Sequence, residues 1–248
     1  MKKALSLVCM FLLAPALASA QIRQVSSSNS DAKNTVNFTV GWFALKGLDS
    51  RATDDVLYNE LLNPGLVNGK PQPLQFEIKD LNSVPFGGEW LIGLGRNFEA
   101  GVGLAYSQRT APSVYAHLTH SNGDEVRQDL KLKQVPIAFT ARFLPMGRGG
   151  AVEPYIGAGI VAIRWRFSET GEFIDGTGTI YSGSYVADGT ATGPIVLGGV
   201  RFPFGAMVAG AEGRWQKVEG KGLLNQGFLG DKIDLGGWTL NFTVGARF

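Results

Sequence analysis

The sequence predicts an all-β fold, an eight-stranded antiparallel barrel that crosses a membrane with its strands. Three observations lead to this fold class. Eight segments of about 10 residues each alternate apolar and polar side chains with a period of two. The connections between these segments alternate between long and short. All five tryptophans lie on apolar faces, at the same end of their segments.

Each of the eight segments carries its large apolar side chains on one face and mostly small or polar side chains on the other. In chain order, the first four and their apolar faces are 35–45 with Val36, Phe38, Val40 and Trp42; 87–97 with Trp90, Ile92 and Leu94; 100–110 with Val102, Leu104 and Tyr106; and 130–143 with Val135, Ile137, Phe139, Ala141 and Phe143. The last four are 153–167 with Tyr155, Val161, Ile163, Trp165 and Phe167; 193–202 with Val196, Val200 and Phe202; 206–217 with Met207, Ala209, Ala211 and Trp215; and 238–248 with Trp238, Leu240, Phe242, Val244, Ala246 and Phe248.

The connections assign an end of the barrel to each loop. The long ones run at 46–86, 111–129, 168–192 and 218–232, and the short ones lie near Arg96–Glu99, Pro145–Gly150 and Pro203–Ala206. If the first strand runs upward, all long loops fall at the top, and all short turns and both termini fall at the bottom. The expected fold therefore has long extracellular loops and short periplasmic turns.

Three loop segments carry local structural signals. In the first loop, Ala52–Asn63 has apolar residues four apart and early aspartates, which is typical of a short helix. Leu74–Leu81 alternates and predicts a strand extension. The third long loop is expected to form a hairpin above the membrane.

The alternation fits two architectures, a soluble sandwich with apolar faces inward and a membrane barrel with apolar faces toward lipid. The second is favoured because strands of about 10 residues span a bilayer when tilted. The polar faces are also rich in Gly, Ala, Ser and Thr, which suit a narrow barrel interior better than a hydrated surface.

Aromatic residues at both ends of the apolar faces predict two interfacial girdles, because an indole ring is apolar but carries an N–H group that prefers water. The upper girdle is expected to consist of Trp42, Trp90, Trp165, Trp215 and Trp238. Tyr155 and Phe143 are expected in the lower girdle, together with the terminal residue, Phe248.

Charged residues on the polar faces are expected to form a lumen charge network. These residues are Glu89, Arg142, Arg164, Arg166, Arg201, Glu212 and Arg214. An eight-stranded barrel is just wide enough to be filled by side chains, and charges inside it must pair because an isolated ion in a low dielectric is too costly. We expect salt bridges that plug the lumen; the alternative is a gated polar path or the floor of a small pocket.

Residues 1–20 are expected to be a signal peptide that is cleaved on export. A basic start precedes the apolar run Leu5–Leu17, and Ala18–Ala20 forms a small-residue cleavage site. The one cysteine, Cys9, lies in this segment, so the exported chain has no disulfide framework.

The rest of the chain divides into a polar periplasmic segment, 21–34, and a barrel domain, 35–248. Removal of Lys2 and Lys3 with the signal peptide leaves 21 basic and 21 acidic residues, so the exported chain has no net charge. Nothing in it points to nucleic acid, and we expect no cofactor and no metal ligands.

Two motifs could suggest an enzyme but have simpler interpretations. Gly157–Ala162 matches a dinucleotide fingerprint, yet it lies within an alternating strand rather than between a strand and a helix. His117 and His120 precede Ser121-Asn122-Gly123, which is faintly similar to the active-site segment of barrel lipid A deacylases. Asn-Gly is also a strong hairpin-turn dipeptide. We therefore expect no catalytic residue.

Taken together, these features resemble the small eight-stranded outer-membrane barrels of Gram-negative bacteria, the OmpA, OmpX and OmpW type. The resemblance covers 35–248, and "EPYIGAGI" (Glu153–Ile160) and "GAEGRWQ" (Gly210–Gln216) are similar to segments of OmpW-like barrels.

The resemblance implies an outer-membrane protein, a monomer with both termini in the periplasm and in contact with lipid and lipopolysaccharide. It also implies that the β-barrel assembly machinery recognises Phe248 as a terminal assembly signal. The expected role is structural or surface interaction. The alternatives are an OmpW-like conduit or binding protein for small, hydrophobic solutes and a lipid A-modifying enzyme.

Overall fold

The computed structural model describes residues 33–67 and 69–248. The expected signal peptide and residues 21–32 of the expected polar segment lie outside the described residues. Within the described part, the barrel strands begin at Asn34 and end at Arg247.

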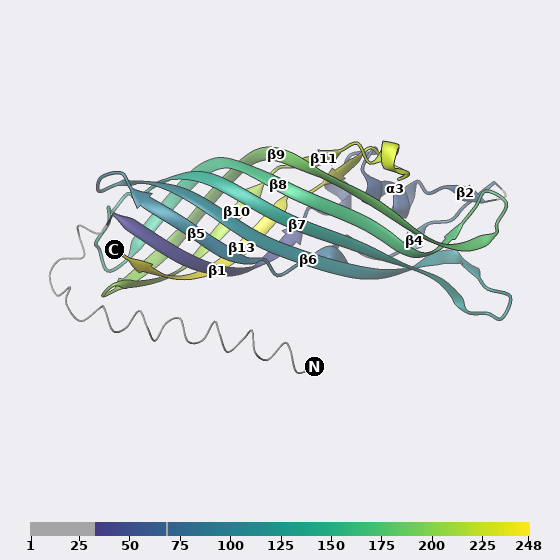
Figure 1. Cartoon of the computed structure of the whole chain (residues 1–248), viewed down its shortest axis with the longest axis horizontal. Helices are drawn as coiled ribbons and strands as arrows, with labels where there is room; N and C mark the ends of the chain where they lie inside the picture. The colour runs from purple at the N-terminus through teal and green to yellow at the C-terminus, as the bar shows by residue number, and fades with distance from the viewer. Residues whose placement is uncertain (1–32, 68) are drawn as a thin grey trace.

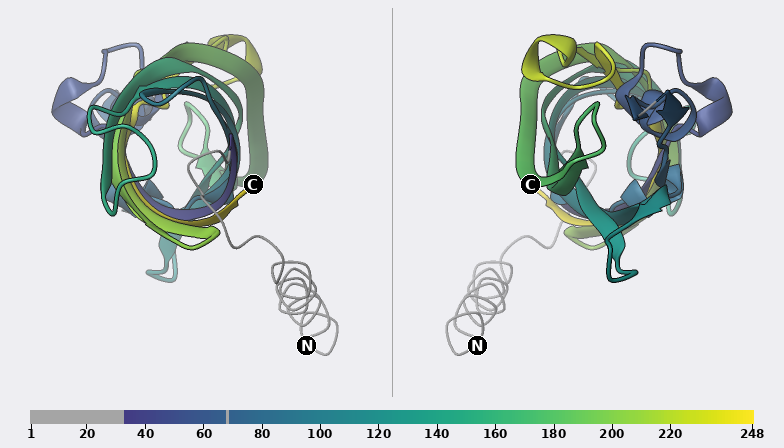
Figure 2. Two further views of the ribbon diagram at one scale, coloured as in Figure 1. Left: turned by 90° about the vertical axis from the view of Figure 1, so that its left-hand side faces the viewer. Right: turned by 90° about the vertical axis from the view of Figure 1, so that its right-hand side faces the viewer.

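Eight antiparallel strands close into a ring, which confirms the predicted fold class (Figures 1 and 2). In ring order the strands are β1 (Asn34–Leu45), β5 (Phe86–Gly93), β6 (Phe98–Thr119), β7 (Glu125–Phe143), β8 (Glu153–Ile174), β9 (Ile180–Phe204), β10 (Met207–Gln216) and β13 (Gly237–Arg247). The ring closes where β1 pairs with β13, from Thr35 opposite Arg247 to Leu45 opposite Gly237. In the lower part of the ring each strand pairs with a neighbour on both sides, as a sheet surrounded by lipid requires.

The smaller elements gather at the end of the barrel away from the C-terminus, which we call the upper end (Figure 1). They are α3 (Val56–Leu62), β2 (Leu66–Val67), β3 (Lys70–Pro71), β4 (Leu74–Gln75), β11 (Glu219–Lys221), β12 (Lys232–Asp234) and three 3-10 turns at Leu48–Ser50, Ile78–Leu81 and Leu224–Gln226. The expected helix and strand extension both occur, the latter only as β4, which pairs with β6. Among the described helices, none is long and apolar enough to cross a membrane.

Helix α3 begins at a side-chain cap. The Asp55 carboxylate accepts hydrogen bonds from the backbone N–H groups of Leu57 (3.0 Å) and Tyr58 (3.3 Å), which satisfies donors that the first helical turn leaves free. Arg51 donates to both oxygens of the same carboxylate, at 2.8 and 2.9 Å. The cap therefore also ties the helix to the chain before it.

Four strands are far longer than a membrane crossing needs. β6, β7, β8 and β9 have 22, 19, 22 and 25 residues, whereas about 9–11 residues span a bilayer. The expectation of a long loop at 111–129 is therefore wrong for most of its length, whereas 168–192 forms the expected hairpin, with Ile174 opposite Ile180. Only short turns remain, and the predicted Asn122-Gly123 turn is one of them, with Gly123 at φ +90°.

In the lower half of β7 the apolar side chains point outward, whereas in its upper half they point inward. Near the lower end its outward side chains are apolar, with Phe139 59 % exposed. Near the upper end Lys131 points outward and is exposed, whereas Leu130 and Leu132 point inward and are buried. The period of two never breaks, but the apolar face changes from outside to inside. The strand has left the lipid and entered water at the upper end.

The same change corrects two predictions made for β8. Trp165 is buried inside the upper part of the barrel, not in the outer girdle. Tyr155 is also buried, but for another reason: it lies in the lower lumen, where its ring packs beside Arg142 and Arg201. Arg164 and Arg166 point outward and are exposed, so they are not lumen charges. Ile160, which is 61 % exposed, belongs to the lipid face instead. Alternation alone does not tell which face meets lipid, and on this strand the large apolar residues above residue 160 fill a soluble extension.

The upper interior is a continuous apolar core. Its buried members are Phe43, Leu45, Val56, Leu57, Leu74, Ile78, Leu81, Ala111, Leu130, Leu132, Ala138, Val161, Ile163, Trp165, Phe167, Ala187, Ala191, Ile195, Val218, Leu223, Phe228, Ile233 and Leu235. They come from the long strands, from α3 and from the loops, so the first and last loops cover the barrel rather than project from it.

The remaining girdle residues face outward, but one of them lies at the other end of the barrel. Trp42, Trp90, Trp238 and Phe143 are 54, 47, 63 and 40 % exposed, and Trp215 is half-buried. The prediction of Trp90 in the upper girdle is wrong: it lies opposite Val36 near the lower end of β1, and its indole N–H donates to Asn34. Phe248 is 67 % exposed, and its backbone exchanges two hydrogen bonds of 3.0 Å with Asn34. The last residue is thus held by the first strand of the barrel.

Candidate functional site in the barrel lumen

A central cluster of four charges crosses the lumen. Arg142 from β7 places one Nη2 atom 2.7 Å from Glu89 Oε1 on β5 and 2.7 Å from Glu212 Oε2 on β10. Arg214 contacts the same two carboxylates, with Nη2 3.1 Å from Glu89 Oε1. The two cations balance the two anions. Arg214 is 15 % exposed, and the other three side chains are 1–2 % exposed.

A second group of charges, the lower cluster, lies toward the end where the short turns and the C-terminus are found. Arg201 Nη2 on β9 lies 2.8 Å from Glu99 Oε2 on β6 and 3.6 Å from Glu153 Oε2 on β8. Arg247 binds Glu153 with both guanidinium arms. Arg148, from the turn between β7 and β8, lies 3.1 Å from Glu99. All five side chains are at most 10 % exposed.

Tyr155 joins the two clusters. Its hydroxyl donates to Glu212 Oε2 at 2.9 Å, and the guanidinium carbons of Arg142 and Arg201 lie 4.7 and 5.0 Å from its ring centre. Gly199 leaves the space this ring needs, because a Cβ there would lie 2.6 Å from the hydroxyl. Ion pairs and cation–π contacts therefore form one layer across the barrel.

The structure brings five of the seven predicted network residues, and not the exposed Arg166, into this layer: Glu89, Arg142, Arg201, Glu212 and Arg214. Arg164 is not among them. Its side chain is 73 % exposed and lies 3.4 Å from Asp188 on the outer surface.

Sequence reasoning missed five members of the layer: Glu99, Arg148, Glu153, Tyr155 and Arg247. A signal existed for Glu99 and Arg247, because each shares its face with the small or polar residues of its segment. Tyr155 was assigned to the opposite face with the other large apolar residues of its strand.

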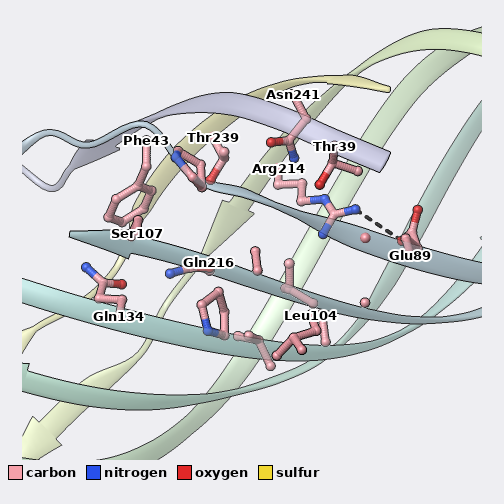
Figure 3. Close-up of a pocket in the computed structure, with 18 residues that line it drawn as sticks. Thr39, Phe43, Glu89, Leu104, Ser107, Gln134, Arg214, Gln216, Thr239 and Asn241 are labelled. Carbon is pink, nitrogen blue, oxygen red and sulfur yellow. Dashed lines mark hydrogen bonds and ion pairs between the residues drawn. The ribbon is translucent and has the colours of Figure 1, made fainter. Parts of the chain in front are cut away.

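A small cavity lies directly above the central cluster (Figure 3). Its volume is about 60 Å³, and Glu89 and Arg214 form part of its lining. Phe43, Val161 and Ile195, members of the upper core, also line it. The lumen is thus narrowed by charge below this cavity and by apolar packing above it.

The barrel wall beside this cavity carries an interruption. Along the described β6–β7 ladder, paired residues stop at Leu104 opposite Ile137 and resume at Ser107 opposite Gln134. Pro136 lies in this gap and has no N–H group to donate. Leu104 and Pro136 also line the cavity, although Leu104 is 55 % exposed on the outer face. The cavity therefore lies against the barrel wall at this gap.

The fold and the lumen define a class of protein: an eight-stranded β-barrel with an apolar outer belt and a charged interior. The chain is similar to the outer membrane protein OprG from Pseudomonas aeruginosa, with 12 % identity, a TM-score of 0.52, and coverage of 88 % of this chain and 96 % of OprG. This likeness confirms at the level of the fold the predicted resemblance to small outer-membrane barrels.

Two further solved structures match with lower scores. The N-terminal β-barrel domain of Pseudomonas aeruginosa OprF is 12 % identical, with a TM-score of 0.41 and coverage of 88 % of this chain and 98 % of that domain. Ail, the attachment invasion locus protein of Yersinia pestis, is 13 % identical, with a TM-score of 0.39 and coverage of 87 % and 99 %. No protein-family model and no curated protein matches the sequence.

Proposed function

We propose that the chain is an outer-membrane protein of a Gram-negative bacterium with a structural or surface-interaction role, and that it is not an enzyme. The apolar belt on the outside of the barrel supports the location, since so many exposed large apolar side chains require lipid around them. Both ends of the barrel domain would then lie in the periplasm, and the long strands and covering loops would lie outside the cell.

The observation that carries the closed-lumen proposal is the layer of buried ion pairs. Each carboxylate of the central cluster contacts two arginines, Arg142 and Arg214. An ion passing through would have to replace these contacts in a region of low dielectric, and removing one partner from a buried pair costs several kcal/mol. The layer thus supports a barrel that holds its upper end at the membrane surface and does not conduct ions through its lumen.

Planar-bilayer recordings test the closed lumen. We expect the refolded protein to give no discrete conductance steps in KCl. The variant Arg142→Ala with Glu212→Ala keeps the charge balance and leaves Arg214 facing Glu89, and it should show steps because it removes one contact spanning the lumen. Conductance steps in the unmodified protein would overturn the proposal.

The gap in the β6–β7 ladder favours a second candidate function, a conduit for small hydrophobic solutes between the lumen cavity and the lipid. Uptake of a small apolar solute by protein-containing vesicles tests it. Ala105→Leu, which fills the cavity lining, should abolish uptake, whereas Ala100→Leu on the outward face of the same strand should not. Equal uptake by both variants would remove this candidate.

Phe248 provides a test of the outer-membrane assignment. We expect deletion of Phe248 to lower the amount of membrane-inserted protein in cells, because the β-barrel assembly machinery would no longer recognise the terminal residue. Refolding in detergent should change less, since only two backbone hydrogen bonds to Asn34 are lost. Heat-modifiable protein in the membrane fraction measures both; unchanged insertion in cells would show that Phe248 is no assembly signal.

A further inference from the structure

A second pocket, separate from the lumen cavity, lies at the upper end and is lined by residues of α3 and of the long strands. Its volume is about 270 Å³. Its rim includes exposed residues such as Leu66, Tyr181 and Leu229, so the pocket opens to solvent. The described lining residues include three acids, Glu60, Glu169 and Asp175, and no Lys, Arg or His.

Two of these acids are buried without a cationic partner. Glu169 lies on the inward face of β8, and its side chain is 4 % exposed. Its Oε2 accepts a hydrogen bond from Gln128 Nε2 at 3.1 Å, but its Oε1 has no hydrogen-bond partner among the described atoms. Glu60 of α3 is 8 % exposed, and its carboxylate makes no hydrogen bond or ion pair within the described part of the chain. Buried carboxylate oxygens are normally paired, so these atoms call for donors from outside the chain.

The charges around the pocket do not compensate for the two acids. Burial raises the pKa of Glu60 to about 7. Burial, and then the neighbouring Glu60, raise the pKa of Glu169 well above its usual range. Two basic groups beside α3 are engaged elsewhere, Arg51 with Asp55 and Lys232 with Asp54. The two carboxyl groups are therefore partly protonated near neutral pH, and a cation bound beside them would favour their ionised forms.

Aromatic rings form much of the remaining wall. Phe173 and Tyr185 contact edge to face, with ring centres 4.8 Å apart, and the Tyr185 and Tyr181 hydroxyls lie 2.9 Å apart. Tyr115 donates to Gln128, which in turn donates to Glu169. Phe228 completes the lining. Rings beside buried carboxylates attract cations through their negative faces and accept an apolar body at the same time.

We propose that this upper pocket binds a small organic cation, a primary ammonium carried on a short alkyl body. The unpartnered carboxylate oxygens need N–H donors, which a quaternary ammonium lacks. A divalent metal ion would need six or more oxygen ligands, and the described residues hold no group of three or more acidic, His or Cys side chains suited to a metal. The proposal does not depend on whether the lumen conducts.

Isothermal titration of the refolded, detergent-solubilised protein with five probes tests the charge requirement. We expect 1,4-diaminobutane and butylamine to bind, and butan-1-ol, which has the same alkyl body without charge, not to bind. Tetramethylammonium and Ca²⁺ should bind at least tenfold more weakly than the amines. Equal binding of butan-1-ol, or tighter binding of Ca²⁺ or tetramethylammonium, would overturn the proposal.

The isosteric variants Glu60→Gln and Glu169→Gln test the location. Each should weaken amine binding at least tenfold, whereas Asp129→Asn, beside Gln128 on the same strand but facing outward, should change it less than twofold. Both test variants remove an unpaired buried charge, so the fold should persist. Unchanged amine affinity in the folded variants would refute the site, and the comparison of the five probes in the unmodified protein decides the matter if a variant does not fold.

Proton release gives an independent readout. A bound ammonium favours the ionised carboxylates, so binding near pH 7 should release protons, and affinity should fall as the pH is lowered below about 7. Titrations in buffers of different ionisation enthalpy measure the release, which Glu60→Gln should reduce. Amine binding that is independent of pH between 5 and 8, with no proton release, would contradict the proposal.

Discussion

The Arg142→Met variant is expected to lose about 3–5 kcal/mol of unfolding free energy, because it leaves two buried carboxylates with Arg214 as the remaining cation of the central cluster. Arg142 joins Glu89 to Glu212, as Arg214 also does, and its guanidinium covers one face of Tyr155. Methionine keeps most of the side-chain volume, so the loss reports charge rather than a cavity. Urea unfolding in lipid vesicles, followed by tryptophan fluorescence, measures it.

Arg164→Met is the matched control for this variant. It makes the same change on the outer surface, where the ion pair with Asp188 is exposed, and exposed pairs contribute about 0–1 kcal/mol. Similar losses in the two variants would show that Arg142 is hydrated and that the lumen is open to water.

Trp165→Ala is expected to destabilise the barrel by about 3–5 kcal/mol, the range for truncating a large buried aromatic residue. Trp165 is 1 % exposed and lies between Gly189 and Gly220; a Cβ on Gly220 would come within 2.6 Å of the ring. The upper core cannot readily close over the space left, because strand backbones form its walls. The same urea unfolding measures the loss.

Trp238→Ala tests the other side of the barrel wall. Trp238 is 63 % exposed on the outer face, so its truncation leaves no internal cavity and should cost clearly less than Trp165→Ala. A larger loss for Trp238→Ala would mean that Trp165 belongs to the outer girdle, as the sequence pattern alone had predicted.

The eight strands and their order follow from sequence because period two and loop length are local properties. Phe139 and Phe242 could be assigned to lipid, since their strands carry small or polar residues on the opposite face. Trp165 and Arg164 could not be assigned in this way. Their alternation is the same in lipid and in water, and only the height of the membrane surface decides which of the two points inward.

The charged layer could be predicted in part for a related reason. The two-residue alternation along β10 places the side chains of Glu212 and Arg214 inward, but it does not show which charges meet across the lumen. The partner Arg142 lies three strands away around the ring, so this contact depends on how the sheet closes. The upper pocket is more remote still, because the local sequence gives no sign that Glu60 of a loop helix meets Glu169 of β8.

The central claim is that β7 passes from lipid to water between its lower and upper halves, and thiol labelling tests it most directly. Residues 21–248 contain no cysteine, so single cysteines can be placed at the outward positions Lys131 and Phe139 without background. In lipid vesicles, a charged, membrane-impermeant maleimide should label Lys131→Cys rapidly and leave Phe139→Cys unlabelled until detergent is added. Rapid labelling of Phe139→Cys in lipid, or protection of Lys131→Cys, would contradict this placement of the membrane and the barrel described here.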